Sequence, residues 1–106
     1  MAKAIGMIEV QGYSVALTAM DKACKAANIT IEGIDSNNPS LGDAATIPVV
    51  IQVKFTGEVS DVKIALEVAR QEASRFIDEG DVLTHLIPNP FAGIEKLLAL
   101  GKVKPK

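Results

Sequence analysis

Two residues of this sequence have side chains suited to acid–base or nucleophilic chemistry, and each residue type occurs once. His85 is the one side chain whose ordinary pKa lies close to neutral pH, so it is the candidate general base. It stands in an alternating stretch, where a core or interface histidine fits at least as well. No serine or aspartate is spaced so that a catalytic triad can be read from the sequence. The sequence therefore predicts no catalytic residues.

Cys24, the single cysteine, falls on the apolar side of an amphipathic segment, which predicts a buried core residue rather than a nucleophile. One cysteine and one histidine exclude a disulfide framework, a multi-thiolate metal site and a polyhistidine site. The acidic turn at 78–81 lacks the spacing of a calcium loop, and no glycine motif for phosphate binding is present. We therefore expect neither a metal nor a cofactor.

Composition narrows the class of protein further. The 106 residues are 48% hydrophobic and 23% charged with a net charge of −2, which is typical of one folded domain. The small net charge and the 4% aromatic content argue against nucleic-acid binding. The apolar runs are too short to span a membrane, and no signal peptide is visible, so a cytoplasmic protein is expected. A mean hydropathy of +0.25 in so small a domain indicates that copies of the chain cover part of its surface.

Hydrophobic periodicity predicts two β-α-β halves. The first half has a strand at 5–10, a helix from Tyr13 to Ala27 that follows Gly12 as its N-cap, and a strand at 29–34. The predicted buried stripe of this helix has apolar residues at steps of three and four: Leu17, Met20, Cys24 and Ala27. Further alanines keep the helix thin, so that another element can approach it closely.

The second half has an alternating strand at 49–56, a helix with Ser60 as its N-cap, and a strand at 82–87. The predicted buried stripe of its helix is Val62, Leu66, Ala69, Ala73 and Phe76. A last helix is predicted, with Asn89 as its cap, Pro90 at its first position and Gly101 after its end.

The element order β-α-β-loop-β-α-β-α predicts an α/β (α+β) fold of ferredoxin-like type. We expect a four-stranded, mainly antiparallel sheet with three helices packed on one face. A single domain over residues 4–100 is followed by a short basic tail at 101–106. The segment from Asp35 to Pro48 has no periodicity and is rich in turn residues, so it is a long loop. Loops of this length in compact domains are usually functional.

Four stretches together resemble the shell proteins of bacterial microcompartments, the single BMC-domain type. They are the segments at 4–12, 19–28, 56–63 and 85–90, and they occur in the order that the family has. The resemblance implies a structural protein whose cyclic hexamers tile into the facets of a shell in the cytoplasm. It further implies a central pore for small metabolites, other shell proteins as partners, and enzymes enclosed by the shell.

The resemblance also assigns residues to the hexamer edge. Lys25 corresponds to the lysine that pairs with its counterpart across the edge, and Asp21 and Asn28 are its expected supports. The family usually has an arginine where this chain has Asn89. An arginine has five donors in a fixed fork and an asparagine has two, so a weaker or different contact between hexamers is expected.

The family's pore loop is a short turn, whereas this chain has a longer segment at 36–49. Six such loops around one axis would plug the pore or build a raised collar. The candidate lining residues are Asn37, Asn38, Ser40, Gly42 and Asp43. A ring of Asp43 side chains would favour cations. The alternative is a loop that packs over the neighbouring subunit and gates nothing.

Two other functions stay open at the level of sequence. The first is a regulatory oligomer of ferredoxin-like fold that senses a small molecule and closes its long loop over the effector. The second is a small oligomeric enzyme that uses His85.

Overall fold

The computed structural model describes residues 3–37 and 50–98, and it contains four strands and two α-helices in that part of the chain. Four of the predicted pore residues, Asn38, Ser40, Gly42 and Asp43, and the tail at 101–106 lie outside the described residues. The elements are β1 (Ala4–Gln11), α1 (Tyr13–Ala26), β2 (Ile29–Asn37), β3 (Val50–Gly57), α2 (Val59–Ala73) and β4 (Leu83–Ile87). Single 3₁₀ turns are formed by Glu79–Asp81 and Ile94–Leu97.

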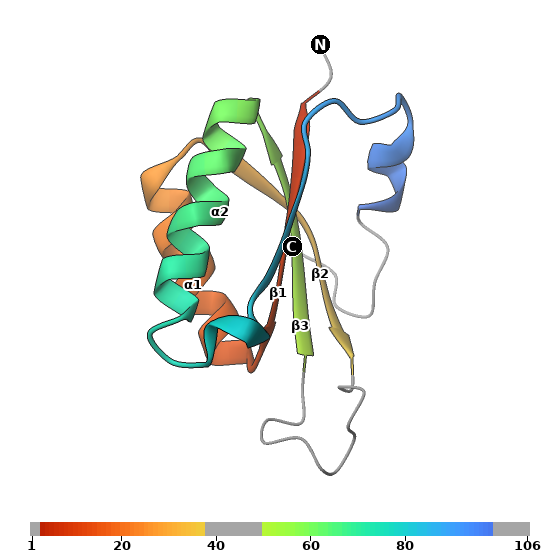
Figure 1. Ribbon diagram of the computed structural model, residues 1–106. Helices are drawn as coiled ribbons and strands as arrows, with labels where there is room; N and C mark the ends of the chain where they lie inside the picture. The colour runs from red at the N-terminus through yellow and green to blue at the C-terminus, as the bar shows by residue number, and fades with distance from the viewer. Residues whose placement is uncertain (1–2, 38–49, 99–106) are drawn as a thin grey trace.

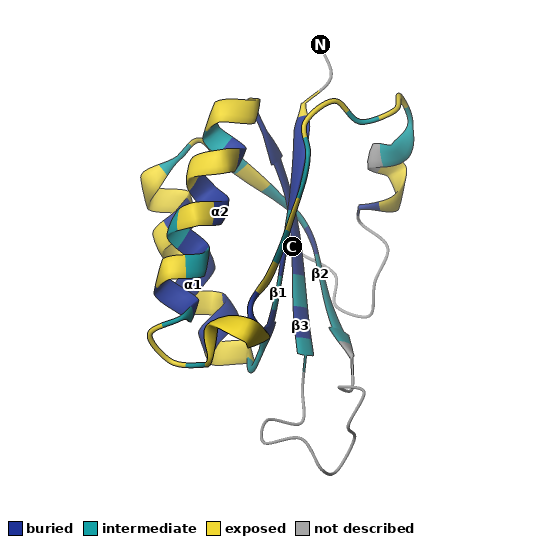
Figure 2. Cartoon of the chain, in the orientation of Figure 1, coloured by how far each residue is buried: buried dark blue, intermediate teal, exposed yellow. Residues whose placement is uncertain are grey.

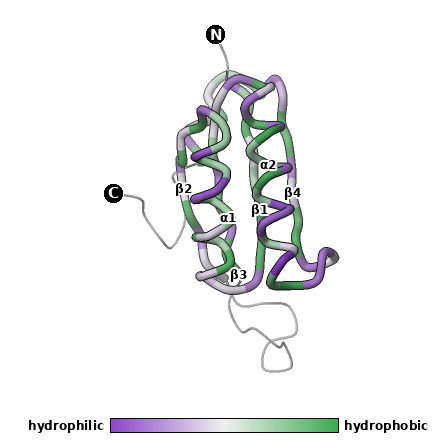
Figure 3. The backbone as a smooth tube through the Cα atoms, turned by 90° about the vertical axis from the view of Figure 1, so that its left-hand side faces the viewer, coloured by the Kyte–Doolittle hydropathy of each residue, from purple (hydrophilic) through white to green (hydrophobic). Residues whose placement is uncertain are grey.

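The four strands form one sheet in the order β2-β3-β1-β4, and every neighbouring pair is antiparallel. This confirms the predicted antiparallel sheet and the ferredoxin-like element order. Both α-helices cover the same face of the sheet, and the segment after β4 lies on the other face (Figure 1). Seen from the helix side, α1 lies toward the β2 edge and α2 toward the β4 edge (Figure 3). Strands β2 and β4 are thus the two free edges of the sheet.

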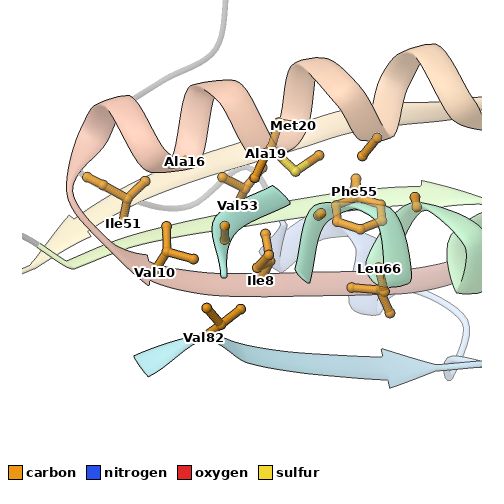
Figure 4. Close-up of a cluster of buried hydrophobic side chains, with 14 of the residues drawn as sticks. Ile8, Val10, Ala16, Ala19, Met20, Ile51, Val53, Phe55, Leu66 and Val82 are labelled. Atoms are coloured by element: carbon orange, nitrogen blue, oxygen red, sulfur yellow. The ribbon is translucent and has the colours of Figure 1, made fainter. Parts of the chain in front are cut away.

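The core lies between the sheet and the two helices. Alternate residues of the central strands point into it, and Ile8, Val53 and Phe55 are buried under small residues of α1 such as Ala16 and Ala19 (Figure 4). Alanines at these positions let α1 approach the sheet and α2 closely. The outward faces of both helices are exposed (Figure 2).

The predicted buried stripe of α1 is correct at Met20, which is buried, and wrong at Leu17 and Cys24; Ala27 is half-buried against the core. Leu17 is 58% exposed and Cys24 is exposed as well. The side chains that α1 buries are Val15, Ala16, Ala19, Met20 and Ala23. Helix α1 has two apolar stripes, and the periodicity of the sequence does not say which stripe faces the core. The thin alanine stripe is the buried one because it packs against both the sheet and α2.

For α2 the predicted stripe is correct over Val62, Leu66, Ala69 and Ala73, which are all buried. Phe76 lies beyond the end of the helix and is exposed. The helix begins at Val59 with Glu58 as its N-cap, so Ser60 is not the cap. N-caps are usually Ser, Thr, Asp or Asn, whose side chains bond to the first turn. Glu58 makes no such bond, so the start of this helix cannot be recognised from the sequence.

The predicted third helix is also wrong within the described residues. Only a 3₁₀ turn forms at Ile94–Leu97, on the sheet face opposite the two α-helices. Gly93 just before it has φ +98°, which is outside the helical region and separates the turn from Pro90. The segment then returns to the sheet, where a Cβ at Gly33 would overlap the carbonyl oxygen of Leu98. That glycine is therefore required by the close approach of two backbones.

Candidate assembly surfaces at the two ends of the sheet

Three of the predicted edge residues lie together at the C-terminal end of α1. Nζ of Lys25 donates a hydrogen bond to Oδ2 of Asp21 at 2.9 Å, one helical turn away, and both side chains are exposed. The hydrogen bond and the negative charge of Asp21 raise the pKa of Lys25 above its ordinary value, so the ammonium group stays protonated. An ammonium group has three donors, so Lys25 can bind a further acceptor outside this subunit.

Asn28 is placed by its backbone rather than by its side chain. Its N–H donates to Oδ1 of Asp61 at 3.2 Å, which ties the turn between α1 and β2 to the first turn of α2. The side chain of Asn28 is exposed beside the end of α1. The bond thus fixes the position of the C-terminal end of α1, which carries Lys25, relative to the start of α2.

Asn89, the fourth predicted edge residue, is exposed and follows the end of β4. Among the described residues, no hydrogen bond joins its side chain to Asp21, Lys25 or Asn28. It nevertheless lies at the same end of the sheet, because β4 ends where β1 begins, with Ile87 opposite Ile5. The fold therefore gathers all four edge candidates at one end of the sheet.

The long loop was predicted to start too early, because Asp35, Ser36 and Asn37 pair with β3 as the end of β2. The strands that flank residues 38–49 meet at the opposite end of the sheet. Asn37, whose backbone ends β2, pairs with Val50, and Val50 pairs with Gln11 at the end of β1. Strand β3 has eight residues, so the two ends of the sheet are about 26 Å apart. Of the five predicted pore residues, Asn37 alone lies within the described segments.

His85 is exposed on β4, opposite Met7, and is not a core residue. The described residues contain no group of three or more His, Cys, Asp and Glu side chains placed to hold a metal. Across the same residues, no helix has the length and apolar character that crossing a bilayer requires.

Glu72 is a buried carboxylate that the sequence analysis missed. Its Oε1 accepts a hydrogen bond from Arg75 at 2.8 Å, and its Oε2 accepts one from Thr18 at 2.8 Å. The bonds from Arg75 and then Thr18 lower the pKa of Glu72 below its ordinary value. The available signal was its position one residue before Ala73, on the edge of the buried face of α2.

The thiol of Cys24 lies near the carboxylate of Asp21 on α1. Partial burial raises the pKa of Cys24, and the carboxylate of Asp21 raises it further. A thiol with a raised pKa is a poor nucleophile at neutral pH, so Cys24 does not have the properties of a catalytic cysteine.

Comparison with known proteins identifies the fold. The family model of the BMC domain matches residues 4–90, which is most of the chain. The chain belongs to the BMC domain family. It is 31% identical over 101 residues to the carboxysome shell protein CcmK2 of Synechocystis sp., covering 94% of this chain and 88% of that protein. It is 31% identical over 99 residues to the bacterial microcompartment shell protein PduA of Citrobacter freundii, covering 93% and 95%.

A solved structure of a microcompartment protein from Desulfitobacterium hafniense has the same fold, with a TM-score of 0.68 and 18% sequence identity. The match covers all of this chain and 52% of that one, so this chain spans about half the length of the solved protein. Membership of the BMC domain family confirms the expected structural role in the shell of a bacterial microcompartment.

Proposed function

We propose that this shell protein forms cyclic hexamers, and that these discs join edge to edge, with other shell proteins, into facets around encapsulated enzymes. The proposal is carried by one observation. The residues assigned to the edge lie at one end of the sheet, and the strands that flank the long 38–49 segment end at the other. A disc needs one end of each subunit at its axis and the other at its rim.

At the rim, Lys25 is the contact residue between discs. Asp21 supports this role because it accepts the hydrogen bond that holds the Lys25 side chain against α1. Asn89 stands at the same end of the sheet with an amide in place of a guanidinium. Its two donors make fewer bonds to a neighbouring disc than the five donors of an arginine.

At the axis, the segment between Asn37 and Val50 contributes to the pore. Six copies bring amide, hydroxyl and carboxylate groups to one axis, with Asn38, Ser40, Gly42 and Asp43 as the lining candidates. Such groups replace part of the hydration of a polar metabolite, and a ring of Asp43 carboxylates favours cations over anions.

A structural shell protein needs no catalytic centre. The raised pKa of the Cys24 thiol makes it a poor nucleophile, which supports a purely structural protein. A sensing regulator of the same fold remains the competing function, because a long loop can close over an effector.

Light scattering coupled to size-exclusion chromatography, followed by negative-stain electron microscopy, tests the proposal. We expect a hexamer mass, six-fold discs, and sheets or tubes at higher protein concentration. A monomer or a dimer without discs contradicts the proposal. A thermal shift with nucleotides or amino acids in place of assembly favours the regulator instead.

A further inference from the structure

Asp61 places a carboxylate from α2 at the end of the sheet that carries Lys25. Helix α2 follows directly on β3, which ends at Gly57, and Gly57 pairs with Ala4, where β1 begins. Asp61 lies in the first turn of α2, and its Oδ1 accepts the backbone N–H of Asn28 at 3.2 Å. The start of α2 and the C-terminal end of α1 therefore meet at the end of the sheet assigned to the rim.

The half-buried carboxylate of Asp61 can accept further hydrogen bonds. Among the described residues, the N–H of Asn28 is its hydrogen-bond donor, and no lysine or arginine forms an ion pair with it. A carboxylate has about four acceptor sites, so most of them are unused in the subunit. The bond to a backbone N–H also restrains this side chain, which lowers the conformational entropy that a partner must overcome on binding.

Lys25 is the complementary group at the same end of the sheet. Its Nζ donates to Asp21 of the same helix and, within the described part of the chain, is not paired with Asp61. The ammonium group has three donors, and the side chain is 75% exposed. Each subunit thus presents a cation with free donors and a carboxylate with free acceptor sites, and the two do not satisfy each other within the subunit.

We infer that the acceptor for Lys25 in a neighbouring disc is the carboxylate of Asp61. The inference rests on the proposed tiling of hexamers and names the partner of Lys25 in that contact. Two identical edges that meet around a two-fold axis are self-complementary, because a contact of one residue with another is repeated in the reverse direction. Lys25 of each disc therefore meets Asp61 of the other, and both charges are compensated.

The first test changes the charge of Asp61 and leaves the disc intact. Asp61→Asn keeps an oxygen that can accept the N–H of Asn28 but removes the charge, and Asp61→Lys reverses the charge. We expect an unchanged hexamer mass for both variants. Sheets should need a several-fold higher protein concentration for the asparagine variant and be absent for the lysine variant, as measured by sedimentation and electron microscopy.

Glu58→Lys is the matched control for the first test. Glu58 is exposed, stands at the N-cap of α2 three positions before Asp61, and makes no side-chain capping bond. The substitution makes the same change of charge at the same end of the sheet. Its discs should tile at close to the concentration of the unaltered chain. Tiling that is lost to the same extent in Glu58→Lys and Asp61→Lys overturns the assignment to Asp61.

The second test mixes preformed discs of two variants that should not tile alone. Lys25→Asp discs have a carboxylate at both positions of the contact, and Asp61→Lys discs have an ammonium group at both, so each kind repels itself. An edge between the two kinds pairs opposite charges at both positions. We expect each variant alone to stay in the supernatant and an equimolar mixture to sediment with both variants in the pellet.

The control mixture combines Lys25→Asp discs with Glu58→Lys discs. It supplies the same added charge at the wrong position, so Lys25→Asp should remain in the supernatant. A control mixture that brings Lys25→Asp into the pellet as completely as Asp61→Lys does overturns the inference. A test mixture that stays in solution overturns it as well.

These outcomes are distinct from failure of the proposed function, in which the unaltered chain forms no hexamers or no sheets. When the unaltered chain tiles and the Asp61 variants tile equally well, the pairing is overturned while the shell assembly stands. Circular dichroism and thermal melting check that each variant folds. Should Asp61→Lys fail to fold, the concentration at which Asp61→Asn forms sheets decides, and a value equal to that of the unaltered chain overturns the inference.

Discussion

The hydroxyl of Thr18 on α1 donates a hydrogen bond of 2.8 Å to Oε2 of Glu72 on α2, and this bond links the two helices where they pack together. The other carboxylate oxygen of Glu72 accepts from Arg75, and Lys22 of α1 lies 3.9 Å from the same oxygen. A buried carboxylate on α2 is thus satisfied by α1 and by the turn that follows α2. Its ionised form is the one that the fold favours.

Replacing this carboxylate should destabilise the fold in a pH-dependent way. The pKa of Glu72 is lower in the folded chain than its ordinary value of 4.5, chiefly because of Arg75 and then Thr18. The stabilisation that the ionised Glu72 gives to the fold is therefore fully present above about pH 4.5, and it is lost as the pH falls through the folded-state pKa. Glu72→Gln should lower the melting temperature at pH 7, and the difference from the unaltered chain should shrink below pH 4.5.

Exposed Glu67 on the same helix provides the control for that measurement. Glu67→Gln should leave the melting temperature nearly unchanged at both pH values. A Glu72→Gln difference that is the same at pH 7 and pH 3 would show that packing, not charge, is what Glu72 contributes.

The sheet is closely packed at Gly6. A Cβ on Gly6 would lie 2.6 Å from Cε2 of Phe55 and 2.8 Å from Cγ1 of Val62, and both neighbours are fully buried. Gly6→Ala should therefore lower the free energy of unfolding by about 1–3 kcal/mol in urea titrations, as overpacked cores do. Gly80→Ala is the control. A Cβ there meets nothing within 4 Å, so we expect a change within about 0.5 kcal/mol.

The edge assignment of Lys25 predicts a separation between disc formation and tiling. Lys25→Ala and Lys25→Asp should leave the hexamer mass unchanged, because the side chain is exposed at the end of the sheet assigned to the rim. Sheets and tubes should be absent from electron micrographs, most completely for the aspartate, which reverses the charge. Lys96→Asp makes the same change of charge at another exposed site. Tiling that survives both Lys25 variants contradicts the assignment.

Asn89→Arg should strengthen tiling. The substitution supplies a planar guanidinium with five donors at a site where the present amide has two. Sheets should then form at a lower protein concentration than with the unaltered chain, as measured by sedimentation and electron microscopy. Asn89→Gln, which lengthens the side chain without adding charge, should give no such gain.

The long segment between β2 and β3 should control passage through the disc. Replacing residues 38–49 with a short Gly-Ser turn keeps Asn37 and Val50, which end the paired strands. If the segment lines or plugs the pore, metabolite flux into intact compartments should change while the hexamer mass stays the same. Unchanged flux would leave the segment without a role in the pore.

Most of the fold was accessible from local patterns. The alternation at Val49 to Thr56 predicted β3, observed at Val50–Gly57, because a half-buried strand repeats its environment every second residue. Gly12 was correctly predicted as the N-cap of α1, where its φ of 97° suits a glycine. The predicted third helix failed because its signals lie at its ends, whereas Gly93, with its positive φ, interrupts its first turn.

The edge residues were assigned by resemblance to a family, and the contacts between them became visible only in the folded chain. The spacing of Asp21 and Lys25 predicts an ion pair on one helix, and that pair is present. The bond from Asn28 to Asp61 joins residues 33 positions apart, which no local pattern reveals. The burial of Glu72 was missed because a charged residue is ordinarily assigned to the solvated face of a helix.

The sequence by itself determined the order of the strands and helices and the excess of apolar surface, because periodicity and composition are local properties of the chain. Only the tertiary structure decided which apolar stripe of α1 is buried, since that depends on how closely α1 can approach the sheet and α2. The alanine stripe permits the closer approach and enters the core. Leu17 and Cys24 are thereby left exposed on the surface of the subunit.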